Sequence, residues 1–481
     1  MVVPPPEGQP DTAFALQTLA RLPLADAFYA LWAYLAPDGV LARLFELHRG
    51  RCYDDRLHFD ELVAVLADAL TRHHGSGRRA IAAAIEQQAL PCRARAVYGK
   101  LARLPLPLAE AFLSALTARL RPLLPAGTCR TELPASLAGL AVVVLDGKKI
   151  KNAAKRLLAC RGRPGKLYGG KILAAYLPAE GLAVALAADP DGEANDVRLV
   201  PRALGLARDA VAGPRLWVAD RQFCDLDQAA RFTEQGDHFL VRWTARNSFA
   251  ADPSRPAQTG ADAAGQAFVQ EWGWMGAAGG ERRRYVRRIT LLRPGEESVA
   301  LVTDLWDEQA HPAADLLVVY LARWQVENCF QQITEVFGLK RLIGCAPGAT
   351  VFQASLCLVI YNGLQVIRGY IAAGRPGPKA AELSSEMIFR DLHEELVSVH
   401  KTLRLGEVLS VLARPSGGAA VAAHLRARLA GLWSPLWQKA TNRRPRPHKP
   451  AAKQSGAHTS VHKVLQQAKQ TQQQPPTPKR Q

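Results

Sequence analysis

The sequence predicts an α/β protein in which an all-helical N-terminal part precedes a mixed sheet with helices packed on it. Residues from about 12 to 125 repeat apolar side chains at three-to-four spacing, which is typical of consecutive amphipathic helices. From Ser136 onward, short apolar runs bounded by turn residues indicate strands that alternate with helices. At 481 residues, the chain is too long for one ordinary core, so we expect two or three domains.

The helical part contains FDELVAVLADALTRHH from Phe59 and LAEAFLSALTARLRPLL from Leu108, both with helical apolar spacing. Breaks are expected at Leu90–Pro91 and at Leu104–Pro107. Between them lies CRARAVYGKLARL, a short basic helix. It is either a DNA-reading helix or, more commonly in proteins, a basic amphipathic surface helix.

The sheet begins with LAGLAVVVLDG, a strand expected to end at Asp146. KLYGGKILAAYL and LAVALAAD flank the turn Pro178–Gly181 and predict a hairpin. A helix capped by Asn195 or Asp196 follows, and then RLWVADR, a strand that ends at Asp220. One more helix and the strand DHFLVRW give the order strand–strand–strand–helix–strand–helix–strand. Among known layouts, the ribonuclease-H-like mixed sheet has that order.

A β-rich insertion is expected at about 245–297, where AFVQEWGW and RRRYVRRITLL predict a β-ribbon. A strand and the long helix AADLLVVYLARWQVENCFQQITEVF follow it. The apolar run from Val351 contains Gln353, Asn362 and Gln365, so we expect a buried helix rather than a membrane span. The expected division is a helical domain at 1–130, a ribonuclease-H-like domain at 136–376, a helical region at 377–437 and a basic disordered tail at 438–481.

The charge balance points to a polyanionic partner. The chain has 61 Lys+Arg against 43 Asp+Glu, a formal charge of +18 and a pI near 9.8, which favours nucleic acid over an anionic membrane surface. The tail from Gln438 supplies ten Lys/Arg and no acid, either as an arm that touches phosphates or as a solubilising extension. Eight scattered cysteines without a C-x-x-C pair argue against a zinc site and disulfides, and fit a reducing cytosol.

Two acids stand where apolar strands are expected to stop, Asp146 after VVVL and Asp220 after LWVA. Acids at the carboxyl ends of neighbouring strands converge on the crevice where open sheets bind ligands. Each could instead be a turn or cap aspartate, which strand ends commonly carry. Two of them in one basic protein favour a site.

The long helix predicts a third acid near the same place. At 100° per residue, one stripe faces the core, formed by Val319, Val326, Phe330, Ile333 and Phe337. Tyr320, Arg323 and Glu327 share a second face at its margin, where a carboxylate can reach a site. The alternative is an Arg–Glu salt bridge on a solvated face, worth a few tenths of a kcal/mol.

The run YLARWQVENCF (Tyr320 to Phe330) resembles the Y-x2-R-x3-E motif of bacterial insertion-sequence transposases of the DDE type, in the insertion-sequence-four group. VVLDGKKIK resembles the first-aspartate strand of that family, and VADRQF its second. The resemblance covers roughly residues 136–370. The family motif often has a lysine seven residues after the glutamate, where this chain has Thr334.

The resemblance implies that Asp146, Asp220 and Glu327 are catalytic and bind metal, with two Mg²⁺ ions or Mn²⁺ as cofactor. It implies inverted-repeat cleavage and strand transfer into target DNA, with a helical domain at 1–130 that binds the DNA ends, a homodimer in the DNA complex and a hairpin step. The location would be the bacterial cytoplasm, at the nucleoid, with no membrane partner. We expect DNA contacts from Tyr320, Arg323, Lys148, Lys149, Arg221, Trp272 and Trp274, although the tryptophans could instead form a small insertion core. The alternatives are an inactive or repurposed DNA-binding protein that keeps the fold, and a nuclease that only hydrolyses.

Overall fold

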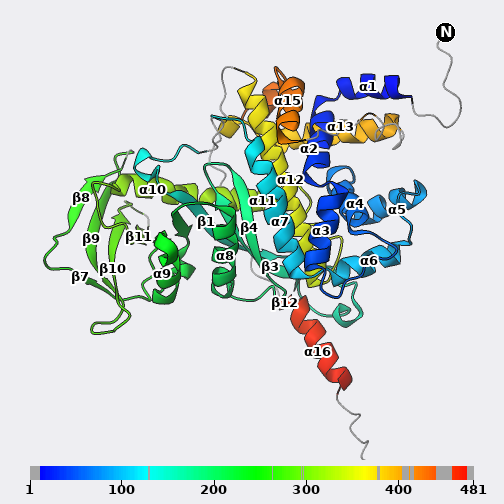
Figure 1. Cartoon of the computed structure of the whole chain (residues 1–481). Helices are drawn as coiled ribbons and strands as arrows, with labels where there is room; N and C mark the ends of the chain where they lie inside the picture. Colours follow the sequence, from blue (N-terminus) through cyan, green and yellow to red (C-terminus); the bar gives the residue numbers. More distant parts are fainter. Residues whose placement is uncertain are drawn as a thin grey trace, which may run out of the picture.

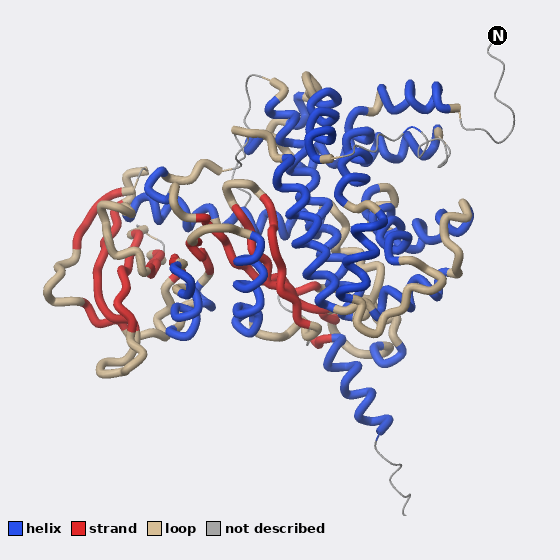
Figure 2. The backbone as a smooth tube through the Cα atoms, viewed as in Figure 1, coloured by secondary structure: helices blue, strands red, loops and turns tan. Residues whose placement is uncertain are grey.

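The protein consists of a helical part and a large twisted sheet, which lie side by side in Figures 1 and 2. The computed structural model describes residues 11–127, 131–262, 264–293, 295, 297–375, 380–403, 411, 417–439 and 458–473. Mixed α/β architecture with a helical N-terminal region is the predicted fold class, and it is confirmed.

The N-terminal part is all-helical, as its apolar spacing predicts. The two expected breaks lie between helices: Leu90–Pro91 falls between α5 and α6, and Pro105 directly precedes α7. At the start of α5, Ser76 caps the helix by accepting a hydrogen bond from the Arg79 amide. The helices are α1 Thr12–Ala20, α2 Pro23–Leu35, α3 Asp38–His48, α4 Phe59–Thr71, α5 Gly77–Glu86, α6 Ala94–Arg103 and α7 Leu106–Leu120.

The central sheet has the predicted ribonuclease-H-like order β4-β3-β1-β5-β6 in its first five strands. β1 pairs antiparallel with β3 and parallel with β5, β5 pairs parallel with β6, and β3 and β4 form the expected hairpin. The bounds are β1 Ala141–Ile150, β2 Leu167–Tyr168, β3 Gly170–Leu177, β4 Leu182–Asp189, β5 Arg215–Ala219 and β6 His238–Arg242. The short 3-10 helices η3 Leu158–Cys160, η4 Asp196–Leu199 and η5 Arg221–Phe223 and the helices α8 Val200–Ala210 and α9 Leu226–Phe232 connect them.

The insertion does not form a separate sheet. Its strands extend the central one in the order β6-β11-β10-β9-β7, with β8 paired to β9. These strands are β7 Phe249–Ala251, β8 Gln258–Ala261, β9 Ala267–Met275, β10 Arg284–Leu291 and β11 Val299–Thr303. The extension curls away from the helical part (Figure 1).

The helix α12 (Pro347–Ala373) joins the two parts. Figure 1 shows β3 and β4 between α8 on one side and α7 and α12 on the other. Among the described residues, α12 is the one single helix long and apolar enough to cross a membrane, and its apolar window is wholly buried in the protein. The bent pair α6 and Leu106–Leu123 passes the same test only if it counts as one span. The expectation of a buried helix is confirmed, and the polar Asn362 supports it by bonding the backbone of Ala183 in β4.

The C-terminal region corrects one expectation, because part of the tail is folded. After α13 (Ser385–Thr402), α15 (Gly418–Leu429) and η8 (Pro435–Trp437), the strand β12 (Thr459–Ser460) pairs with β2, and α16 (Val461–Gln473) follows it. Val461 and Val464 are fully buried. A disordered tail is therefore wrong for residues 458–473, because the apolar side chains at i and i+3 find a surface to cover. Residues 440–457 and 474–481 lie outside the described residues.

Candidate active site

Strand pairing brings the two predicted aspartates together. The parallel register of β1 and β5 ends with Leu145 opposite Ala219, so Asp146 and Asp220 are the next residue on each strand. β1 does not stop at Asp146 as expected. It continues to Ile150, paired only with β3, because its partner β5 ends there. Asp146 thus stands at the carboxyl edge of the parallel pair, which is where ligands of such sheets bind.

Asp146 is a half-buried carboxyl whose charge is disfavoured. Burial raises the pKa of Asp146 to about 7, and the neighbouring Glu327 and Asp196 add to the rise. The Arg323 guanidinium and a hydrogen bond from the Gly147 amide to Asp146 Oδ1 (3.0 Å) act in the opposite direction. A further positive charge at this point would favour the ionised form.

Asp220 directly follows β5 and occupies the N-cap position of the 3-10 helix η5, but its side chain makes no capping hydrogen bond. Its Oδ1 is buried and has no hydrogen-bond partner among the described residues. A buried carboxylate oxygen without a partner is costly, so this atom is suited to receive a cation or a donor from a ligand.

The third acid stands on a helix that is broken in two. The expected continuous helix divides into α10 (Ala313–Ala322) and α11 (Trp324–Glu335) at Arg323. The Arg323 amide bonds the carbonyl of Tyr320, and the Val326 amide bonds that of Arg323, so the chain tightens to i,i+3 spacing here. The predicted core stripe is nevertheless buried at all five positions, Val319, Val326, Phe330, Ile333 and Phe337.

Arg323 lies among all three acids. It is 6% exposed, and its Nη1 is 2.9 Å from Glu327 Oε1. Burial acts to lower the pKa of Arg323, but the charges of Tyr320, Asp220, Glu327 and Asp146 outweigh it and raise that pKa. Asp146, Asp220 and Glu327 therefore share one electrostatic neighbourhood, as predicted. The Arg–Glu pair of the alternative interpretation is also present, but on a buried arginine rather than on a solvated face.

The donor chemistry fits a divalent cation. Carboxylate oxygens are the ligands that Mg²⁺ prefers, and both the buried Asp220 Oδ1 without a partner and the disfavoured charge of Asp146 suit a nearby cation. In the part of the chain that the structure describes, however, no three His, Cys, Asp or Glu side chains are already grouped to hold a metal ion. Arg323 Nη1 pairs with Oε1 of Glu327 at 2.9 Å.

Asp196 is a buried acid of this neighbourhood that the sequence did not single out. Its Oδ1 is 2.5 Å from Lys171 Nζ on β3, and its Oδ2 accepts a hydrogen bond from Gln222 Nε2 at 2.8 Å. A Cβ added to Gly147 would lie 2.4 Å from Asp196 Cγ, so the two residues are in close contact. Asp196 thus connects the end of β1 with the turn after β5. In the sequence, Asp196 stood out only as one of two possible caps of the following helix. In the structure Asn195 is that cap, and its side chain accepts a hydrogen bond from the Val197 amide.

The predicted DNA contacts divide into accessible and buried residues. Lys149 and Arg221 are exposed, while Lys148 lies over the ring of Phe330 (5.3 Å) and burial lowers its pKa. Tyr320 is 6% exposed, which raises its pKa, and it lies beside Arg323.

The two tryptophans of the insertion differ. Trp272 is fully buried, its Nε1 donates to the Trp306 carbonyl at 2.9 Å, and Arg255 covers its ring. A role for Trp272 in stacking on DNA is therefore wrong, and it forms the core of the insertion. Trp274 is half-buried and packs edge-on against Tyr285.

No lysine takes the position of Thr334. Its hydroxyl donates to the Phe330 carbonyl of its own helix at 2.6 Å. Of the two nearby cations, Lys340 pairs with Glu335 (2.6 Å) and Arg341 donates to the His74 carbonyl (2.8 Å). These two cations are thus engaged outside the acidic neighbourhood.

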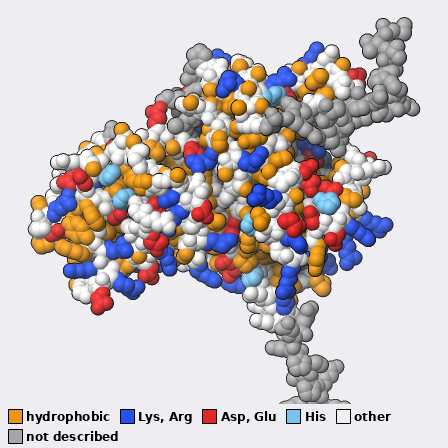
Figure 3. All heavy atoms as spheres, in the orientation of Figure 1, with side chains coloured by type: hydrophobic (Ala, Val, Ile, Leu, Met, Phe, Trp, Pro, Cys, Tyr) orange, Lys and Arg blue, Asp and Glu red, His pale blue; other side chains and the backbone are white. Residues whose placement is uncertain are grey.

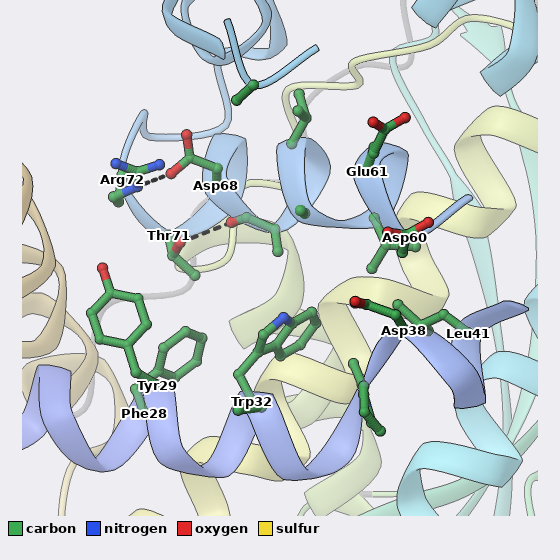
Figure 4. Close-up of a pocket in the computed structure, with 18 of the residues that line it drawn as sticks. Phe28, Tyr29, Trp32, Asp38, Leu41, Asp60, Glu61, Asp68, Thr71 and Arg72 are labelled. Carbon is green, nitrogen blue, oxygen red and sulfur yellow. Dashed lines mark hydrogen bonds and ion pairs between the residues drawn. The ribbon is translucent and has the colours of Figure 1, made fainter. Parts of the chain in front are cut away.

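A large cavity lies elsewhere, in the helical part (Figure 4). It measures about 690 Å³, and Phe28, Tyr29 and Trp32 of α2 face α4 across it. The Arg72–Asp68 ion pair of α4 stands at one end. Asp146, Asp220 and Glu327 do not line this cavity, so it is separate from the acidic neighbourhood.

One family model matches the part of the chain that carries these acids. Residues 138–362 match the family model described as "Transposase DDE domain", a range that contains Asp146, Asp220 and Glu327. No curated protein matches the chain. Among solved structures, the chain is similar to "Cryo-EM structure of piggyBac transposase synaptic complex with hairpin DNA (SNHP)", with a TM-score of 0.41 and 10% identity over 84% of this chain and 85% of that chain. A likeness at that TM-score decides nothing about this chain. Over residues 138–362, a little under half of its length, the chain is similar to the transposase DDE domain.

Proposed function

We propose that this chain is a DNA transposase that cleaves DNA at the ends of an insertion sequence and joins those ends to target DNA. The observation that carries the proposal is the neighbourhood of Asp146, Asp220 and Glu327 around one buried arginine. It lies at the carboxyl edge of a ribonuclease-H-like sheet, inside the range that matches the transposase domain.

The three acids would hold divalent cations, Mg²⁺ or Mn²⁺. When bound, two such ions activate the attacking oxygen and neutralise charge on both the attacking and the leaving oxygen of an in-line displacement. The carboxylates of the chain supply the negative charge that retains them. In the first step, water replaces one phosphodiester oxygen and frees a 3′-hydroxyl at the element end. In the second, that hydroxyl replaces a 3′-oxygen in target DNA, so one phosphodiester is exchanged for another without an external energy source.

Arg323 and Tyr320 would position the scissile phosphate. Arg323 Nε is buried and has no hydrogen-bond partner among the described residues, so it has a donor to offer to a phosphate oxygen. The planar guanidinium suits such an anion. If Arg323 turned toward a phosphate, it would also release Glu327 from their ion pair.

DNA contacts outside the centre complete the proposal. Lys149 and Arg221 are exposed beside the aspartates. In the helical domain at 1–130, α6 exposes Arg93, Arg95 and Arg103, which suits binding of the DNA ends, whereas Lys100 is buried against Asp54. A homodimer that bridges two ends, a hairpin step and a bacterial nucleoid location belong to the same proposal.

A cleavage assay tests this function. Purified protein is incubated with DNA that carries the inverted repeats flanking its gene, with and without Mg²⁺. Wild type should nick and join this DNA only with the metal. Asp146→Asn and Glu327→Gln should lose both reactions and keep DNA binding. Cleavage by either variant at the wild-type rate refutes the triad, and hydrolysis without joined product indicates a nuclease instead.

The second candidate is a non-catalytic DNA-binding protein that retains the fold. The Arg323–Glu327 ion pair favours it, as does the lack, among the described residues, of three ligands grouped for a metal. DNA binding by wild type without cleavage in Mg²⁺ or Mn²⁺ would support this candidate.

A further inference from the structure

A strongly basic segment follows Asp146. Residues 147–169 contain eight Lys/Arg and no Asp or Glu. Lys148 is half-buried and the other seven are exposed, six of them on the loop between β1 and β2: Lys151, Lys155, Arg156, Arg161, Arg163 and Lys166. Among the described residues, none of these seven forms an ion pair with a carboxylate. Their charges are therefore not neutralised within the protein.

The folded C-terminal segment packs on this loop. β12 pairs in parallel with β2, and the Ser460 hydroxyl accepts a hydrogen bond from the Gly192 amide at 3.2 Å. Val461 and Val464 of α16 are fully buried, and the helix lies against η3. Arg163 Nη2 approaches Gln467 Oε1 of α16 at 3.5 Å. The loop and α16 thus form one surface.

The same docking neutralises nearby acids. Lys463 of α16 lies 2.7 Å from Glu193 and 3.6 Å from Asp191, the two acids that follow β4. The outer side of α16 carries Lys469 among glutamines and no acid. Docking of the segment therefore removes charge that would repel an anion and adds a polar, cationic face.

This surface is continuous with the acidic neighbourhood. The basic segment begins one residue after Asp146, and Lys148 contacts Phe330, which is on the same helix as Glu327. Lys149 lies over the ring of Tyr168, the residue that pairs with Ser460 of β12. A path thus leads from the acids along β1 to α16, which projects at the end of the molecule where β3 and β12 lie (Figure 1).

We propose that the loop 151–166 and α16, which we call the basic flank, bind the phosphate backbone of double-stranded DNA that extends from the acidic neighbourhood. The proposal rests on the proposed function for the identity of the anion. The six exposed cations of this loop have no acidic partners among the described residues, and together they suit a ligand with closely spaced phosphates. Such contacts position DNA without reading its sequence. Elsewhere acids and bases are interspersed, as on the face seen in Figure 3.

The first test removes charge from the basic flank. The triple variant Arg161→Gln/Arg163→Gln/Lys166→Gln is compared with Arg390→Gln/Lys401→Gln/Arg426→Gln, exposed positions on α13 and α15 at the opposite end of Figure 1. The affinity for a duplex of about 40 base pairs is measured in EDTA across a salt series. Loss of three phosphate contacts should lower the magnitude of the log–log salt slope by about 3, and the affinity at ~0.1 M salt about a hundredfold. The control should keep the wild-type slope.

The second test detaches α16 without a change of charge. Val464→Asn places an amide in a fully buried position, whereas Gln466→Asn makes the matched change at an exposed position of the same helix. Hydrogen exchange of the α16 amides reports detachment, and thermal unfolding reports the rest of the protein. Val464→Asn should lose α16 protection and weaken DNA binding about tenfold, as loss of roughly one phosphate contact does. Lost protection with unchanged affinity overturns the role of α16.

The outcomes separate this proposal from the proposed function. A wild-type salt slope in the triple variant refutes the basic flank even if Mg²⁺-dependent cleavage is normal. A reduced slope in the triple variant, together with no cleavage by wild type in any divalent metal, supports the basic flank and refutes the transposase reaction.

Discussion

Asp196→Asn should destabilise the fold more than an ordinary loss of a surface charge. Asp196 and Lys171 are 8% and 3% exposed, and their charged atoms are 2.5 Å apart. Removal of one partner from a buried ion pair leaves the other charge uncompensated, which typically costs about 3–5 kcal/mol. Lys171 keeps one acceptor, the Ala194 carbonyl at 2.5 Å, so we expect the lower end of that range.

The measurement is the free energy of unfolding in urea, with Asp227→Asn as the control. Asp227 pairs with Arg282 at 3.0 Å, but the two side chains are 66% and 79% exposed, so its loss should cost at most about 1 kcal/mol. The double variant Lys171→Met/Asp196→Asn should recover part of the loss, because no charge then remains buried. Equal losses for Asp196→Asn and Asp227→Asn would show that Asp196 does not act through a buried ion pair.

Four further predictions concern other contacts. Gly147→Ala places a Cβ 2.4 Å from Asp196 Cγ and should abolish cleavage and lower the unfolding temperature, whereas Gly139→Ala, which meets no atom within 4 Å, should do neither. Burial lowers the pKa of His400 to about 3. As pH falls below about 6.5, the proton therefore binds the unfolded chain rather than the native one, and the free energy of unfolding drops. His400→Gln should remove this pH dependence of the free energy of unfolding in urea titrations. Burial raises the pKa of Glu395 to about 7. Between about pH 7 and 4.5 the native state therefore binds a proton that the unfolded chain does not, and this adds to the free energy of unfolding as pH falls. Glu395→Gln removes that gain, so the free energy of unfolding should fall more steeply on acidification. Trp272→Ala should cost about 3–5 kcal/mol of stability, and an effect on DNA affinity at unchanged stability would contradict its place in the core.

The sequence predicts the acidic neighbourhood because its signals are local. Asp146 and Asp220 directly follow apolar runs, and Tyr320, Arg323 and Glu327 keep their spacing on one stretch of helix. Helical and strand periodicities likewise predict a helical region at about 12–125 and the first five strands of the sheet, since each depends on side chains a few residues apart.

Features that depend on distant partners escaped prediction. Asp196 pairs with Lys171, 25 positions earlier, through a hairpin whose register the sequence does not reveal. The break at Arg323 has no glycine or proline to mark it. Docking of α16 depends on two small apolar side chains, Val461 and Val464, in a segment whose Gln and Lys content is typical of disorder. For Trp272 the sequence left open stacking on DNA or a core of the insertion, and only the partner strand and Trp306 decide for the core.

The unbroken hydrogen bonding from β1 to β9 makes the insertion a geometric extension of the strands that carry Asp146 and Asp220. Five strand-to-strand steps separate β1 from β9 in the sheet. At about 20–25° of twist per step, the two ends are rotated by roughly 100–125°. A rod-like ligand that runs along β1 therefore meets the insertion strands crosswise. Since no hinge separates these strands, the insertion and the acids must approach such a ligand as one body, from two nearly perpendicular directions.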